Sequence, residues 1–287
     1  MNLRKILTTT VTLFSLITWQ QATASDITAY EKADGKNGGL LYDNFLSQGE
    51  VSPQFSNSHT IDISAIKDKS DFFRCKQCHG WDRIGSKGYY GGRKATAGKR
   101  PNVSSVNLLD AAKNLSPQEI FDKIKSPAQS RQLDYDLAQY DPEKNSQLGD
   151  AMPEYGKIFN DREIWDLVKF IKEEGEDYRN YYAMEIKGNY PDAKVKLVEI
   201  GKGGDPINGD SIYEKSCASC HGTNGTQISI GGLSAGEYAR QKTYEVAHKV
   251  KFGQPGSNMA GTPLTTKEMN DLHKALTDTE KYPGMKK

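Results

Sequence analysis

The residues of this sequence that could do chemistry together are its four cysteines, which fall into one repeated pattern. The first copy is Cys75-Lys76-Gln77-Cys78-His79, and the second is Cys217-Ala218-Ser219-Cys220-His221. Each copy places two thiols on one turn and an imidazole directly after the second thiol. Four cysteines can also form two disulfides. Two Cys-x-x-Cys pairs can form a zinc site or a thioredoxin-like redox pair.

The histidine distinguishes these alternatives. Neither disulfides nor a zinc site requires a histidine immediately after the second cysteine, yet both copies have one. Cys-x-x-Cys-His is the attachment signal for haem c, in which the thiols add to two vinyl groups and the imidazole reaches the iron. We therefore predict two covalently bound haem c groups. The attachment residues are Cys75, Cys78, Cys217 and Cys220, and the proximal iron ligands are His79 and His221.

At these motifs the chain resembles the class I cytochrome c family, duplicated within one sequence. A glycine follows the histidine in both copies, at Gly80 and Gly222, as is usual in that family. The resemblance implies a mainly α fold of two cytochrome c-like helical domains with long loops, each wrapped around a covalent haem. It also implies a distal methionine on a loop after each motif, followed by a C-terminal helix that packs across the first helix.

Met259 is the predicted distal ligand of the second haem. It lies in a loop rich in Gly and Pro, at residues 256–263. Thr265 and Glu268 then form a capping box at the start of a helix. Met269 repeats at helical spacing with the apolar residues of that helix, so we assign it to the helix core.

Met152 is the predicted distal ligand of the first haem. The pair Met152-Pro153 resembles the distal loop of the family, and Asn160 and Glu163 cap a helix that follows. Met184 comes after that helix. The remaining histidines are alternatives, although a lone histidine on a helix is more often structural; they are His59, His248 and His273.

The first half of the chain is enlarged between its motif and Met152. One insert, residues 83–100, contains six basic residues and no acidic one. It is either a solvated loop or a site for haem propionates or an anionic partner. Pro101-Asn102-Val103 resembles the family segment whose proline carbonyl holds the proximal histidine. The second half has Ile230-Gly231-Gly232-Leu233 at this place instead.

The order of these segments predicts the domain organisation. Residues 1–24 read as a secretory signal peptide, because Arg4 and Lys5 precede an apolar stretch too short to span a membrane. We expect a domain with an N-terminal extension and inserts at residues 25–175, a linker at 176–207 and a second domain at 208–287. Phe72 and Phe73 are expected to supply apolar residues for the first helix of the first domain. The mature protein is then periplasmic, without a transmembrane span.

Composition narrows the classes of function. The chain has 287 residues, room for about two domains. Its formal net charge of +1 excludes a strongly basic nucleic-acid-binding protein.

The expected function is electron transfer. Two His/Met haems would pass single electrons between other redox proteins, either as a free carrier or as a subunit of a larger dehydrogenase. The alternative is a dihaem oxidoreductase, similar to thiosulfate dehydrogenases or peroxidases, with catalysis at the first haem. The thiosulfate enzymes use a distal cysteine, and this chain has none to spare. A substrate pocket beside Met152, walled by Arg93 and Lys94, would be its place. The sequence favours an electron-transfer protein over an enzyme in its own right.

Overall fold

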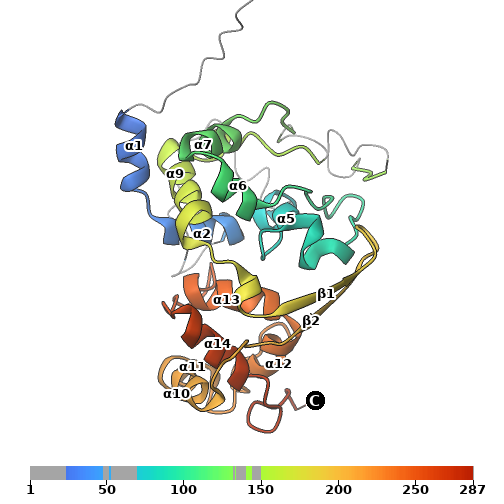
Figure 1. The fold of residues 1–287 in the computed structure, drawn as a ribbon, viewed down its shortest axis with the longest axis vertical. Coiled ribbons are helices and arrows are strands. Elements are labelled where there is room, and N and C mark those ends of the chain that lie inside the picture. The colour runs from blue at the N-terminus through green and yellow to red at the C-terminus, as the bar shows by residue number, and fades with distance from the viewer. Residues whose placement is uncertain are drawn as a thin grey trace, which may run out of the picture.

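A computed structural model of the chain describes residues 24–47, 52, 70–131, 133, 140–143 and 150–286 (Figure 1). It confirms the mainly α fold, since one short hairpin is the only sheet among these residues. The predicted signal peptide, except Ala24, and His59 lie outside the described residues. None of the helices described is long and apolar enough to cross a membrane.

Short helices form the first half of the described chain. They are α1 (Ala24–Glu31), α2 (Gly35–Asn44), α4 (Ser70–Phe73), α5 (Cys75–His79), α6 (Leu108–Asn114), α7 (Pro117–Lys125) and α9 (Asp161–Lys169). Helix α9 continues as a π-helical turn, η5 (Phe170–Glu174). Single 3₁₀ turns connect them: η1 (Gly85–Lys87), η2 (Tyr89–Gly92), η4 (Tyr155–Lys157) and η6 (Tyr178–Asn180).

The second half is smaller and follows a hairpin. Strands β1 (Ala183–Lys187) and β2 (Lys194–Val198) pair antiparallel, with Glu185 opposite Lys196. The helices after them are α10 (Pro206–Ser216), α11 (Ala218–His221), α12 (Ala235–Gln241), α13 (Thr243–Phe252) and α14 (Thr266–Ala275). Capping boxes begin α9 at Asn160 and α14 at Thr265, as predicted.

Helices α2 and α9 cross in backbone contact in the first half. A Cβ added to Gly38 would lie 2.0 Å from the Asp166 carbonyl oxygen, so only glycine fits there. The Asp166 carboxylate accepts hydrogen bonds from the Asp34 backbone N–H at 2.7 Å and the Asn37 side chain at 2.9 Å. One buried carboxylate thus satisfies donors at the start of the helix that crosses it.

The second half repeats this crossing with α10 and α14. A Cβ on Gly209 would lie 2.0 Å from the Asp271 carbonyl oxygen. The Asp271 carboxylate accepts from the Asp205 N–H and from the Asn208 side chain, both at 2.7 Å. The two halves therefore share the pattern Asp-x-x-Asn-Gly-x-x-x-Tyr at residues 34–42 and 205–213.

The place of α2 differs from the sequence prediction, which has an N-terminal extension ahead of the first motif and Phe72 and Phe73 on the first helix of the domain. The structure places these two residues on the short α4, and α2 occupies the position that α10 has in the second half. Three glycines in α2 give it a weak intrinsic helix preference, so its helix depends on packing against α9.

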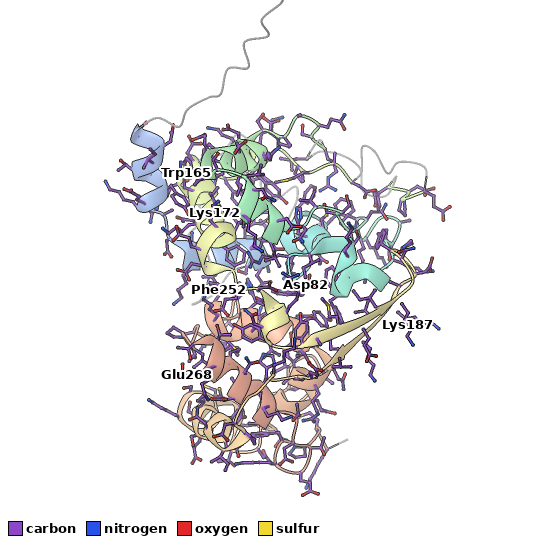
Figure 2. All side chains as sticks on the ribbon, in the orientation of Figure 1. Asp82, Trp165, Lys172, Lys187, Phe252 and Glu268 are labelled. Atoms are coloured by element: carbon purple, nitrogen blue, oxygen red, sulfur yellow. The ribbon has the colours of Figure 1, made fainter. Side chains whose placement is uncertain are left out.

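The two halves meet through α13. The His248 ring Nε2 lies 3.0 Å from the Gly39 carbonyl oxygen of α2. Phe252, at the end of α13, packs into the apolar core of the first half (Figure 2). The hairpin in the expected linker runs along the side of both halves (Figure 1). The halves therefore form a continuous packed structure across α2 and α13.

We expect Gly209→Ala to lower the free energy of unfolding by about 1–3 kcal/mol, because the added methyl group would press on the α14 backbone. Urea unfolding followed by circular dichroism measures this change. Ser211→Ala on the exposed face of the same helix is the control and should stay within about 0.5 kcal/mol of the wild type. Equal effects of the two substitutions would contradict the close crossing.

Candidate functional site

Each Cys-x-x-Cys-His motif is held at its end by a tyrosine, from α2 in the first half and from α10 in the second. Gly80 ends α5 with a φ of +76°, and Gly222 ends α11 with a φ of +80°. The Tyr42 hydroxyl donates to the Gly80 carbonyl at 2.6 Å, and the Tyr213 hydroxyl donates to the Gly222 carbonyl at 2.9 Å. Glycine is favoured in this left-handed conformation. The helix crossing and the motif are thus linked directly in both halves.

In the first half, the predicted site residues converge on one cavity of about 410 Å³. Cys75, Cys78 and His79 line it from α5, and Met152 lines it from the loop before α9. Its walls are largely apolar; they include Val106, Leu108, Ile120, Ile124 and Leu167. The structure brings together all four residues predicted for the first haem.

The chemistry of this cavity fits a haem. Burial raises the pKa of the Cys75 thiol to about 12 and that of the Cys78 thiol to about 11. Burial lowers the pKa of His79 to about 4, so its imidazole is neutral at pH 7, as a metal ligand must be. The volume lies in the range of cofactor pockets, and the apolar walls suit a macrocycle.

The partner of His79 differs from the prediction. The backbone at Val106, rather than the expected Pro101 carbonyl, is the group that opposes the fall in the His79 pKa. This backbone group does not form a regular hydrogen bond with His79, since Nδ1 of His79 is buried without a partner. Asn102 instead donates from its side chain to Asp150 at 2.6 Å, beside the Met152 loop.

Arg131 is a residue of this site that the sequence did not reveal. Its side chain is 3% exposed and lines the cavity. The guanidinium carbon lies 4.2 Å from the centre of the Phe72 ring, and the backbone N–H donates to the Met152 carbonyl at 3.3 Å. An arginine over an aromatic ring gains a cation–π attraction. Arg131 therefore fixes the Met152 loop against α4.

The second motif is more open than the first. Cys217 and His221 are half-buried, whereas Cys220 is exposed. Burial raises the pKa of Cys217 to about 11 and lowers the pKa of His221. Met259 is half-buried on a loop, and its backbone carbonyl accepts a hydrogen bond from the Gln254 N–H at 2.9 Å. Met259 thus stays a prediction that depends on its loop position.

The alternative ligands have other contacts. His248 is 1% exposed and faces the first half, where its ring centre lies 5.1 Å from that of Trp81. His273 stacks on Tyr181 with the ring centres 5.8 Å apart. The basic insert also differs from expectation. Arg93 donates to the Gln77 carbonyl at 2.6 Å and lines a cavity other than the one at Met152.

The four cysteines do not meet. Each pair lies in its own half of the chain, and none of the four thiols is paired. No group of three or more His, Cys, Asp or Glu side chains converges within the described ranges. This arrangement excludes a single zinc site shared by both motifs within that part of the chain.

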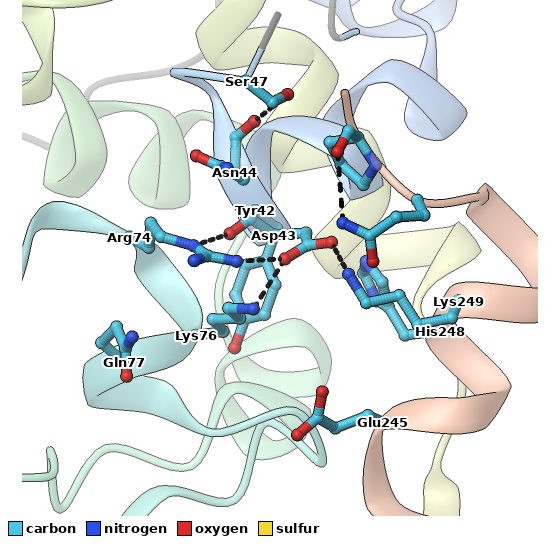
Figure 3. Close-up of polar contacts among 12 residues, drawn as sticks. Tyr42, Asp43, Asn44, Ser47, Arg74, Lys76, Gln77, Glu245, His248 and Lys249 are labelled. Atoms are coloured by element: carbon cyan, nitrogen blue, oxygen red, sulfur yellow. Dashed lines mark hydrogen bonds and ion pairs between the residues drawn. The ribbon is translucent and has the colours of Figure 1, made fainter. Parts of the chain in front are cut away.

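A buried carboxylate beside α5 joins the two halves (Figure 3). Asp43 of α2 is 0% exposed and lies 2.7 Å from both the Arg74 guanidinium and the Lys76 ammonium. Lys249 of α13 completes the cluster from the second half. Burial alone would raise the pKa of Asp43, but Lys76 and Lys249 outweigh it and hold that pKa well below its usual range.

Comparison with family models gives two matches. Residues 68–174 match the cytochrome c model, and residues 204–278 match that of the cytochrome c oxidase, cbb3-type, subunit III. The chain is a c-type cytochrome. Each match contains one Cys-x-x-Cys-His motif and one predicted methionine ligand. Neither curated proteins nor solved structures gave a match.

The identification settles the coarse function of the cytochrome. Cytochrome c domains bind haem c covalently and use its iron for electron transfer, so this chain has a haem-based electron-transfer role. The first match begins at residue 68 and leaves out α2. The helix that completes the first domain is therefore visible only in the structure.

We expect Asp43→Asn to lower the free energy of unfolding by about 3–5 kcal/mol, because it leaves buried cations without their carboxylate. The control is Asp192→Asn, whose partner Lys94 is exposed; it should cost about 0–1 kcal/mol. Urea unfolding of both variants measures the difference, and similar losses would argue against the cluster.

The same cluster predicts a dependence on pH. The folded-state pKa of Asp43 lies below its unfolded value of about 3.9. Its stabilisation is therefore complete above about pH 5 and is lost as the pH falls through the folded-state pKa. Unfolding curves between pH 7 and pH 3 measure the difference in the free energy of unfolding between the wild type and Asp43→Asn. This difference should become smaller only at the acid end of the range.

Proposed function

We propose that this cytochrome is an exported dihaem electron carrier, which passes single electrons between other redox proteins through two His/Met haems. The observation that carries the proposal is the cavity that brings Cys75, Cys78, His79 and Met152 together. The repeated helix crossing and the repeated tyrosine contact support a second site of the same kind at Cys217, Cys220 and His221, with Met259 as its distal ligand.

The residues of the first site have separate roles in this proposal. Haem c, when bound, supplies a one-electron couple, and a methionine ligand raises its potential. Cys75 and Cys78 would tether the group, and His79 and Met152, which line the same cavity, would hold its iron. The apolar walls keep water away, and Tyr42 fixes the end of α5. With His79 and Met152 both holding the iron, no position would be left there for a substrate.

The two sites would differ in how readily a redox partner reaches them. The second motif lies nearer to the protein surface than the first, since Ser219 between its cysteines is exposed, so it is the better contact for a redox partner. The model that matches the second domain describes an oxidase subunit, which supports exchange of electrons with another redox protein. The packed contact between α2 and α13 keeps both sites in a fixed relation. Export to the periplasm follows from the signal peptide read in the sequence.

The haem count tests the proposal first. A pyridine haemochrome assay should give two haems per chain for the wild type. It should give one for the double variant Cys75→Ala, Cys78→Ala and one for Cys217→Ala, Cys220→Ala, because each pair of thiols tethers one group. A wild-type value of one haem per chain would refute the dihaem carrier.

The distal ligand of the first site is tested by Met152→Ala. This substitution should open one iron, lower the potential of that haem and let half of the reduced haem bind carbon monoxide. Met184→Ala on β1 is the matched control and should leave the visible spectrum and both potentials unchanged. A Met152→Ala spectrum identical to the wild type would show that another residue is the ligand.

A further inference from the structure

A second cavity, of about 490 Å³, lies behind the helix that carries the first motif. Lys76 and Gln77 line it, whereas Cys75, Cys78 and His79 line the haem cavity. The two residues between the cysteines thus face away from the first site. The two cavities have no lining residue in common.

Both halves of the chain build the walls of this cavity. The first half supplies Trp81, Tyr90 and Arg93, and the hairpin supplies Val195. The second half supplies residues at the start of α13, where Tyr244 stacks on Tyr89 with the ring centres 3.7 Å apart. A ligand here would touch both halves at once.

Hydrogen bonds fix the part of the cavity wall that the basic insert supplies. The buried Asp82 carboxylate accepts hydrogen bonds from the Ile84 N–H at 3.2 Å and the Tyr89 N–H at 2.6 Å. Arg93 is fixed by two hydrogen bonds to Gln77, one to its backbone carbonyl and one to its side-chain oxygen. The guanidinium carbon of Arg93 lies 4.4 Å from the Tyr90 ring centre. The cationic group is therefore oriented in advance, which reduces the entropy lost on binding.

The cavity is strongly positive. Four basic side chains line it, and Glu245 is the one carboxylate among its lining residues; the basic residues are Lys76, Arg93, Arg100 and Lys242. Burial lowers the pKa of Lys76 to about 7, so this lysine is only partly charged at neutral pH. The whole chain is nearly neutral, with a formal charge of +1, so the positive charge is local rather than general. Converging cations raise the local concentration of anions.

The buried cluster beside the cavity adds less positive charge than its residues suggest. The Asp43 carboxylate faces Arg74, Lys76 and Lys249, and the two lysines are each 7% exposed. Burial lowers the pKa of both lysines, that of Lys76 to about 7. The positive charge that an anion in the cavity would meet therefore comes mainly from Arg93, Arg100 and Lys242.

We propose that this cavity binds a small anion with two or more negative charges, either a di- or tricarboxylate or an inorganic oxyanion. Guanidinium and ammonium groups attract both classes through their positive charge and their hydrogen-bond donors. The volume accommodates a ligand as large as a tricarboxylate. This inference rests on the chain's own residues and does not depend on the axial ligands of the proposed function.

Binding would act on the first haem and on the domain contact. A negative charge behind α5 favours the oxidised state of a haem tethered to that helix, so the potential of the first haem should fall. A ligand that touches both halves stabilises the folded chain and raises its melting temperature.

The test is isothermal titration calorimetry on the haem-loaded full chain at constant ionic strength. The probes are sulfate and phosphate for the inorganic class and malonate and citrate for the carboxylates, with chloride as the reference. We expect at least one probe to bind with one site per chain. Arg93→Gln and Lys242→Gln should each weaken it at least tenfold, since they remove one cation from each half.

The matched control is Lys196→Gln, an exposed residue of β2 that does not line the cavity. It should leave the affinity unchanged. A redox titration with the bound probe should lower the potential of the first haem more than that of the second. Melting curves without ligand check that each variant folds.

Three results would overturn the inference. The first is no binding of any probe beyond that of chloride. The second is binding that Arg93→Gln and Lys242→Gln leave unchanged. The third is binding of an acidic peptide alone, which would make the cavity a docking surface for a protein. None of these results bears on the haem count or the axial ligands, so failure here is distinct from failure of the proposed function.

Discussion

The crossing of two helices at a glycine is the constraint on which each half of the cytochrome depends. At Gly38 and Gly209 the helices approach so closely that no side chain fits between them. One turn further along, Tyr42 and Tyr213 reach the glycine that ends the Cys-x-x-Cys-His helix. The crossing therefore sets the position of the motif, and with it the positions of the two thiols and the imidazole. This link explains why the same nine-residue pattern begins both halves.

The sequence predicted the features that depend on local chemistry. The cysteine motifs, the capping boxes and the mainly α class follow from residue type and spacing, and the family matches confirm the class of protein. It did not predict α2, because its glycines weaken the helical pattern that a single segment shows. The role of these glycines is visible only in the structure, where α9 packs against them. The roles of Asp43 and Arg131 also come from residues distant in the chain.

The site assignments differ in how much supports them. Around the first motif, the cavity joins the attachment residues to Met152, so a sequence expectation gains a spatial basis. Around the second motif, Met259 rests on its loop and on the repeat of the helix crossing. The Pro101 expectation was wrong, since Nδ1 of His79 is buried without a hydrogen-bond partner. The side chain of the next residue, Asn102, donates to Asp150 beside the Met152 loop.

The difference between the two motifs follows from what covers them. Lys76 and Gln77 stand between the first pair of cysteines and lie inside the contact between the halves. Ala218 and Ser219 take their place in the second motif, where Ser219 is exposed. Charges at the contact between the halves therefore lie close to the first motif. Because these charges are buried, salt screens them less than it screens charges on the protein surface. The second motif has no charged residue between its cysteines. The two motifs of one chain therefore differ in the charges that lie beside them.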